Sequence, residues 1–222
     1  NGSSEVARID SAGRVGIGES DPSGYWAQAN QLVIEDGNCG LTLKSAVAGN
    51  GRLVFTDTKS TTAGLNDGGM ISYSHTDDVM IVQTAGAERA RLDASGNLLV
   101  GTTNYNPVAN NVTGHKLYAD GVAQHSASAQ PVAYFNRKTS DGTITEFRKD
   151  GTTVGSIGIE AAGFTIDGET GHTGLQFGYS AIIPRDNGSN TDGANDLGAS
   201  VHRFKDLYLS GGANVGSVVA TG

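Results

Sequence analysis

Residues 88–101 read ERARLDASGNLLVG, and this stretch decides the fold. Apolar and polar side chains alternate on both sides of a turn centred on Gly96, which is the period-two pattern of β-strands. Residues 5–18, EVARIDSAGRVGIG, repeat the pattern, with the glutamate, arginine, aspartate and two glycines at matching positions. Pro22 and Pro107 follow the two copies. The sequence therefore predicts a repeated β-hairpin.

Six residues carry the repeat, and we interpret all of them as structural. The glycines make the turns, and the arginine and aspartate of each copy could pair within one chain or across chains. These residues are Arg8, Asp10, Gly13, Arg91, Asp93 and Gly96. The second copy closes a module, whereas the first copy has no module body before it. We therefore expect the chain to be a piece of a longer modular protein.

The composition predicts a core that several chains share. The chain has 222 residues, 33 glycines, 37% hydrophobic and 6% aromatic residues, so it holds little apolar material for a core of its own. The glycines show no period of three, which excludes collagen. The single Cys39 excludes a scaffold of intrachain disulfides.

Charge and hydropathy exclude two classes of partner. The net charge is −8 and the sequence has no cluster of lysine and arginine, whereas binding to nucleic acid needs a basic face. No apolar run approaches the length of a membrane span. We expect neither nucleic-acid binding nor insertion into a membrane.

Short alternating runs separated by Gly, Asp and Asn predict antiparallel β-meanders. The predicted strands are 31–35, 40–44, 52–57, 69–75, 79–84, 88–93, 97–101, 132–138, 143–149, 153–159, 164–167, 174–178 and 181–184. Asp141-Gly142 and Asp150-Gly151 predict hairpin turns, and Phe147, Val154 and Ile157 are expected to line an inner face.

The predicted strands and turns divide the chain into five segments. They are the end of a truncated upstream module (1–24), a complete β module (25–107), a connector or neck (108–130), a second β module (131–196), and a short helical turn with a C-terminal strand (197–222). The helical turn is expected near residues 200–208, where apolar residues recur at helical spacing.

No catalytic or metal-binding pattern stands out. The acidic residues lie in expected turns and on strand faces, and no nucleophile motif is present. The five histidines have no metal-ligand spacing, although on a threefold axis one histidine per chain could supply three ligands. The polar loop 186–196 lacks the ligand frame of a calcium loop. We expect no enzymatic activity, no metal and no cofactor.

The residues favoured for contact with a receptor are aromatic residues close to polar loops. They are Tyr73, His75, Tyr105 and Tyr179. The alternative for His75 is a strand-face residue at an interface between chains.

Several segments resemble the tail fibre proteins of tailed bacteriophages. RLDASGNLLVGTT (91–103) and RIDSAGRVGIG (8–18) resemble a signature that punctuates these fibres. GGMISYSHTDDVMIVQTAGAERARLD (68–93) resembles the body that precedes the signature. NRKTSDGTITEFRKDGTTVGSIG (136–158) and NDLGASVHRFKDLYLSGG (195–212) resemble segments near the distal end.

The resemblance implies an all-β homotrimeric fibre of glycine-rich meander modules, with intertwined or shared-core segments. Its partners would be two further copies, other tail proteins upstream, and a host surface glycan or outer-membrane receptor. It would act on the virion, outside the cell, in attachment to the host. Such fibres often carry a downstream chaperone, which these residues lack. The alternatives are a tailspike-type glycan depolymerase or its stalk, and a bacterial surface adhesin.

Overall fold

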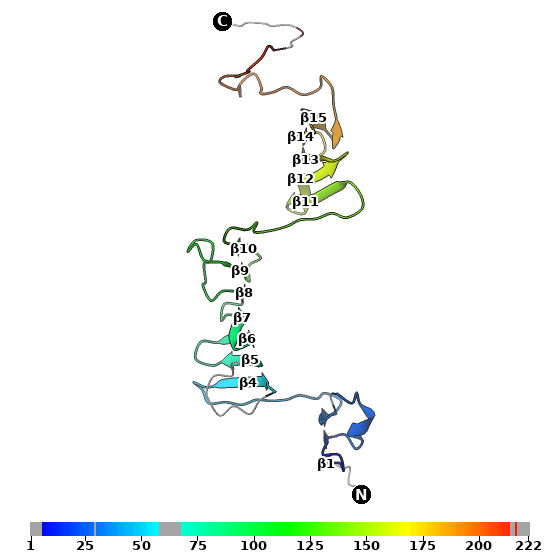
Figure 1. Ribbon diagram of the computed structural model, residues 1–222, viewed down its shortest axis with the longest axis vertical. Coiled ribbons are helices and arrows are strands. Elements are labelled where there is room, and N and C mark those ends of the chain that lie inside the picture. The colour runs from blue at the N-terminus through cyan, green and yellow to red at the C-terminus, as the bar shows by residue number, and fades with distance from the viewer. Residues whose placement is uncertain (1–5, 29, 58–67, 214–215, 217–222) are drawn as a thin grey trace. The chain divides into compact units, whose positions relative to one another are not determined.

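The regular structure of this chain is almost entirely β, which confirms the predicted fold class (Figure 1). The computed structural model describes residues 6–28, 30–57, 68–213 and 216. The chain forms two compact units, residues 1–132 and 133–222. Within the described ranges, no helix is both long and apolar enough to cross a membrane.

The first copy of the repeat opens the first unit. It forms β1 (Ala7–Ile9) and β2 (Val15–Ile17), which pair antiparallel as predicted. A short 3-10 turn, η1 (Pro22–Gly24), returns the chain so that β3 (Leu32–Ile34) pairs parallel to β2. Glu5, the first residue of the repeat, lies outside the described residues.

The second sheet is a seven-stranded meander that contains the second copy. Its strands are β4 (Asn50–Phe55), β5 (Gly69–Ser74), β6 (Val79–Thr84), β7 (Ala87–Leu92), β8 (Leu98–Val100), β9 (Gly114–Leu117) and β10 (Ala123–Ser126). Each strand pairs antiparallel with the previous one, so the sheet grows by one strand at a time (Figure 1). Because neighbouring strands lie about 4.8 Å apart, the sheet rises roughly 30 Å.

The second unit repeats this architecture with six strands. They are β11 (Gly142–Lys149), β12 (Thr152–Glu160), β13 (Gly163–Gly168), β14 (Thr173–Phe177), β15 (Ile182–Asp186) and β16 (Ser189–Asn190), paired antiparallel in chain order. Asp150 and Gly151 both have positive φ between β11 and β12, which confirms this hairpin turn.

Two predicted strands, 40–44 and 132–138, are absent from the sheets. Residues 132–138 do not pair with β11, because the Arg137 guanidinium donates to the carbonyl oxygens of Ser140 and Thr143 and folds the segment onto itself. Asp141-Gly142 is therefore not a hairpin turn. The Asp141 carboxylate instead accepts a hydrogen bond from the Ala161 amide at 2.7 Å.

The segment expected to be a connector, residues 108–130, contains β9 and β10, which extend the seven-stranded sheet. Although this segment is polar, its side chains alternate between the two faces of the sheet. Lys116 and Gln124 point to one face, and their neighbours in the strands point to the other.

The helical turn predicted near 200–208 does not form. Gly198 has φ +96°, and Ala199 pairs with His202 in an isolated bridge, so the chain reverses there without winding. Residues 186–196, expected to be a loop, contain β16. The predicted C-terminal strand lies largely outside the described residues.

Candidate functional site

The largest candidate site is the apolar face of the seven-stranded sheet. Residues that lie opposite one another on neighbouring strands share a face. One such row is Leu53, Ile71, Val82, Ala90, Val100, His115 and His125. The next row is Gly51, Tyr73, Met80, Leu92, Leu98, Leu117 and Ala123. Most of these large apolar side chains are exposed.

The opposite face of this sheet is largely polar, and the chain itself covers it around β8 and β9. Lys116 is buried; its ammonium donates to the Tyr105 carbonyl oxygen at 2.9 Å and lies 3.7 Å from the centroid of the Tyr118 ring. Leu99, its neighbour across the strands, is fully buried, as is Pro107. The chain thus buries a cation on one face while it leaves leucine and valine exposed on the other.

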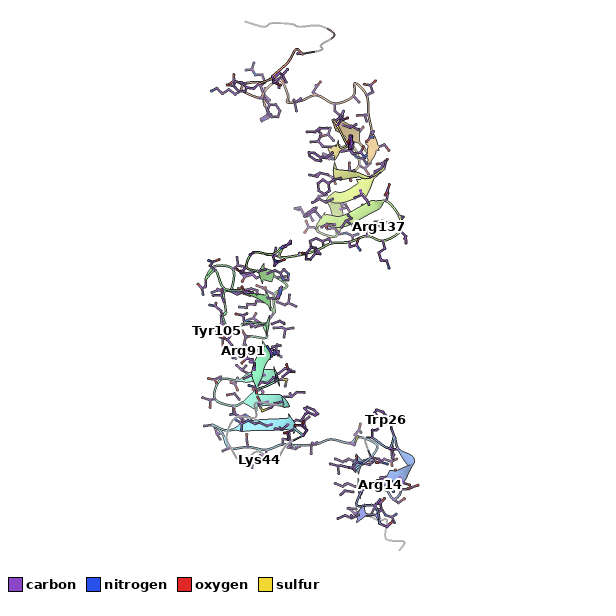
Figure 2. All side chains as sticks on the ribbon, in the orientation of Figure 1. Arg14, Trp26, Lys44, Arg91, Tyr105 and Arg137 are labelled. Carbon is purple, nitrogen blue, oxygen red and sulfur yellow. The ribbon has the colours of Figure 1, made fainter. Side chains whose placement is uncertain are left out.

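Arg91 lies on this covered face and pairs with Glu88. Its Nε and Nη2 atoms donate to the two carboxylate oxygens at 2.5 and 2.7 Å. The hydrogen bonds that Arg91 donates to Glu88 raise the pKa of Arg91, and Tyr105, which is labelled with Arg91 in Figure 2, contributes to the same shift. The expected pairing of Arg91 with Asp93 is not the one observed within the chain.

The two repeat aspartates organise the hairpin turns in the same way. Asp93 Oδ1 accepts hydrogen bonds from the amides of Ser95 and Asn97, both at 2.9 Å. Asp10 Oδ1 accepts from the amides of Ala12 and Arg14 at 2.8 and 3.0 Å.

In both turns, the side chain four residues after the aspartate binds the second carboxylate oxygen. The second oxygen of Asp10 binds Arg14 Nε at 2.7 Å, and that of Asp93 binds Asn97 Nδ2 at 2.8 Å. Gly13 and Gly96 both have φ +80°. The repeat therefore conserves a turn whose aspartate binds backbone amides, and Arg14 or Asn97 supplies the remaining donor.

The second unit also covers a polar face, which is centred on Arg185. This residue is 2% exposed, and its side chain pairs with Asp167 at 2.7 Å and with Glu160 at 2.6 Å. Its Nη1 atom also donates to Asn190 Oδ1 at 2.8 Å. Asn190 Nδ2 donates in turn to Gln176 Oε1 at 2.8 Å, so the exposed Asn190 links the buried Arg185 and Gln176 and joins β15, β16 and β14.

The other face of this second sheet is apolar and exposed. Phe164 and Phe177 face each other across β13 and β14 with ring centroids 6.0 Å apart, and both are exposed. Phe147 and Val154, expected to line an inner face, are exposed as well. Within this unit no other part of the described chain covers these rings.

The burial pattern is the reverse of that in a self-contained globular protein. Among the described residues, the buried hydrophobic side chains are Val33, Val79 and Leu99, whereas eight buried side chains are polar or charged. The apolar faces need a cover that this single chain does not supply.

The four residues favoured for receptor contact do not form one site. The Tyr73 and His75 rings lie edge to face with centroids 5.0 Å apart on the apolar face, and the Tyr73 hydroxyl donates to Asp78 Oδ1 at 3.1 Å. Tyr105 lies in the loop that covers the opposite face. Tyr179 is fully exposed in the turn between β14 and β15 of the other unit.

The pairing of β9 with β10 joins two histidines that the sequence keeps ten positions apart. His115 and His125 lie directly opposite each other, with their Nδ1 atoms 2.7 Å apart. Sequence spacing did not reveal this pair; the signal was the alternation on both sides of the Asp120-Gly121 turn. The described residues hold no cluster of three or more His, Cys, Asp or Glu side chains able to bind a metal ion.

A polar hollow of about 420 Å³ opens on the covered face of the second unit. It is lined in part by Asp141, Glu160, Asp167 and Arg185. Both Glu160 and Asp167 are held by the Arg185 guanidinium, and Asp141 by the Ala161 amide. Each of these three carboxylates therefore has a partner within the sheet.

Comparison with protein families, curated proteins and solved structures finds no match for this chain.

Proposed function

We propose that this chain is a structural segment of a trimeric tail fibre of a tailed bacteriophage, which helps to attach the virion to its host. Three copies would turn their apolar sheet faces toward one another and share one core. The buried polar networks around Lys116 and Arg185 would then lie on the outer side of each sheet. No catalysis is assigned to this segment.

The observation that carries the proposal is the reversed burial in both units. A two-layer fold covers the apolar face of a sheet with a second layer, and here the described chain provides that layer only for the polar faces. The meander supports the same assembly, because a sheet that grows strand by strand can run along a fibre axis beside two copies. The number three and the role in attachment rest on the resemblance of the repeat segments to tail fibres.

In the proposed assembly, the four residues favoured for receptor contact fall into two groups. Tyr73 and His75 lie on the apolar face and would belong to the shared core, which is the interface alternative for His75. Tyr105 and Tyr179 lie away from that face and remain the favoured contacts with a host glycan or outer-membrane receptor. The upstream partners would be other tail proteins.

The first test is the mass of the full chain in solution by light scattering. A mass of three times 22.7 kDa supports the shared core. A stable monomer would contradict it, because the apolar faces of both units would then be exposed to water.

A second test separates the fibre from its rivals. The chain is incubated with bacterial surface glycans on an array, and both binding and glycan length are measured. Binding without shortening supports an attachment role, whereas shortened glycans would favour a depolymerase. A bacterial adhesin would give the same array result, and it would be distinguished by finding the chain on cells rather than on virions.

A further inference from the structure

His115 and His125 form a pair of imidazoles on neighbouring strands at the end of the seven-stranded sheet. Their Cα atoms are register partners in β9 and β10, and both side chains are exposed. The rings meet at an interplanar angle of 60° with centroids 5.0 Å apart. The two Nδ1 atoms converge on one point instead of facing separate partners.

The short contact between these nitrogens has the length of a hydrogen bond. A 2.7 Å contact between two Nδ1 atoms is a hydrogen bond when one ring carries its proton on Nδ1 and the other does not, so the donor and acceptor roles depend on the tautomer of each ring. A neutral imidazole nitrogen is the form of histidine that binds metal ions. When a metal takes the place of the shared proton, the donating ring carries its proton on Nε2 instead.

The distance also suits a metal ion. Two nitrogens that bind one ion at about 2.1 Å lie about 3.0 Å apart at a right angle and roughly 3.4 Å apart at a tetrahedral angle. Small side-chain rotations would widen the 2.7 Å contact by a few tenths of an ångström for the first geometry. Right-angled geometry is typical of Ni²⁺ and Cu²⁺, whereas Zn²⁺ prefers the tetrahedral angle.

The surroundings of the pair place no cation against it on the same face. Lys116 and Gln124, the adjacent residues, point to the opposite face, where Lys116 is held by the Tyr105 carbonyl oxygen. The same-face neighbours along the strands are Leu117 and Ala123, which are apolar.

We propose that His115 and His125 form a two-imidazole site for a divalent transition-metal ion that prefers right-angled coordination. The ion binds Nδ1 of both rings, and its other positions are open to water or to a further ligand. Both ligands belong to one chain, so the pair can bind an ion without a second copy. Because His115 lies beside Val100 on the apolar face, the open positions of the ion would face the other two copies in the proposed trimer.

The test is a titration of the full chain with Ni²⁺ alone, followed by calorimetry. We expect one ion per chain. His115→Ala and His125→Ala should each weaken binding by roughly tenfold or more, because a second ligand on the same scaffold acts at high effective concentration. His202→Ala, a control in the other unit, should bind as the unaltered chain does.

A spectroscopic measurement guards against an indirect effect of the substitutions. Cu²⁺ bound to the unaltered chain should show coupling to two imidazole nitrogens by electron paramagnetic resonance, and His125→Ala should reduce it to one or none. Equal binding by the chain and by both alanine variants would overturn the proposal. So would variants that lose binding only together with their β-sheet circular dichroism.

Discussion

At the scale of single residues, Asp93 determines the turn of the second repeat. Its carboxylate is buried and accepts hydrogen bonds from two backbone amides and the Asn97 side chain. Burial alone would raise the pKa of Asp93, but the hydrogen bonds from Asn97 and Ser95 outweigh it and leave that pKa lowered. The ionised form is therefore the one that the fold binds.

Replacement of Asp93 tests this role. Asp93→Ala leaves the Ser95 and Asn97 amides without their acceptor and should lower the free energy of unfolding by about 1–3 kcal/mol. Denaturant unfolding measures the loss, and Ser95→Ala, which keeps the backbone amide, is the matched control. Equal stability of the two variants would contradict the assigned role.

The same carboxylate predicts a pH dependence. Because the pKa of Asp93 is lower in the folded than in the unfolded chain, its contribution is present above the ordinary aspartate pKa of 3.8. That contribution is lost as the pH falls through the lowered value. We expect the melting temperature to fall more steeply below pH 4 in the unaltered chain than in Asp93→Asn.

Tyr25 offers a residue-scale measurement in the first sheet. Its hydroxyl donates to Glu19 at 2.9 Å and to Glu35 at 3.1 Å, and these carboxylates, Glu19 first, raise the pKa of Tyr25 to about 12. A raised pKa means that this contribution to stability is present below pH 10 and is lost as the pH rises toward 12. Ultraviolet titration should show a late-titrating tyrosine that Tyr25→Phe removes, and Glu19→Gln should shift it to lower pH. A titration unchanged by Glu19→Gln would exclude this pairing.

At the scale of elements, the two turns that flank β12 both have two residues with positive φ, but only one of these turns contains a glycine. Asp150 and Gly151 have φ of +51° and +80°, and Ala161 and Ala162 have φ of +46° and +64°. Positive φ is costly for residues with a Cβ, and primed hairpin turns favour glycine at the second position. The β12–β13 turn therefore holds strain that the β11–β12 turn avoids.

Reciprocal substitutions test this difference. Ala162→Gly should raise the free energy of unfolding by about 1 kcal/mol, because glycine adopts positive φ without a steric penalty. Gly151→Ala should lower it by a similar amount, since no atom lies near the added methyl group and the cost is conformational. Both changes are measured by denaturant unfolding. Shifts of the same sign would contradict the assignment.

The strands also show which parts of the fold could be predicted from the sequence pattern. A short apolar run bounded by turn residues located β6 at residues 79–84 without error, because its turns are short and its neighbours adjoin it in the chain. Residues 132–138 begin with a similar apolar run and form no strand, because the Arg137 side chain binds the backbone that a partner strand would need. The His115–His125 pair was missed for a related reason, since it depends on the register of two strands in a segment interpreted as a connector.

At the scale of the whole molecule, the contacts within each unit bury polar networks, whereas the apolar faces of the sheets stay exposed. The buried guanidinium of Arg185 is satisfied by groups from its own chain. Such a network can be covered by a thin layer of loop, whereas the rows of valine, leucine and phenylalanine need a broad apolar partner. This division fits a protein in which copies supply the core for one another.

A pair of adjacent substitutions in β4 tests that division. Leu53 is 46% exposed on the apolar face, and its neighbour Val54 is 37% exposed on the opposite face. In the proposed trimer, Leu53→Asp would bring three carboxylates into one apolar core, where their desolvation is unfavourable. Val54→Asp would leave its carboxylate on the outer side.

We therefore expect Leu53→Asp to reduce the mass measured by light scattering toward that of one chain and to lower the melting temperature. Val54→Asp should keep the mass of the unaltered assembly, because alternation along the strand places its side chain away from the copies. The two sites lie one residue apart in the same strand with similar exposure, so a difference between them reports the face and not the strand. Trimers of both variants with equal melting temperatures would exclude this face as the shared core.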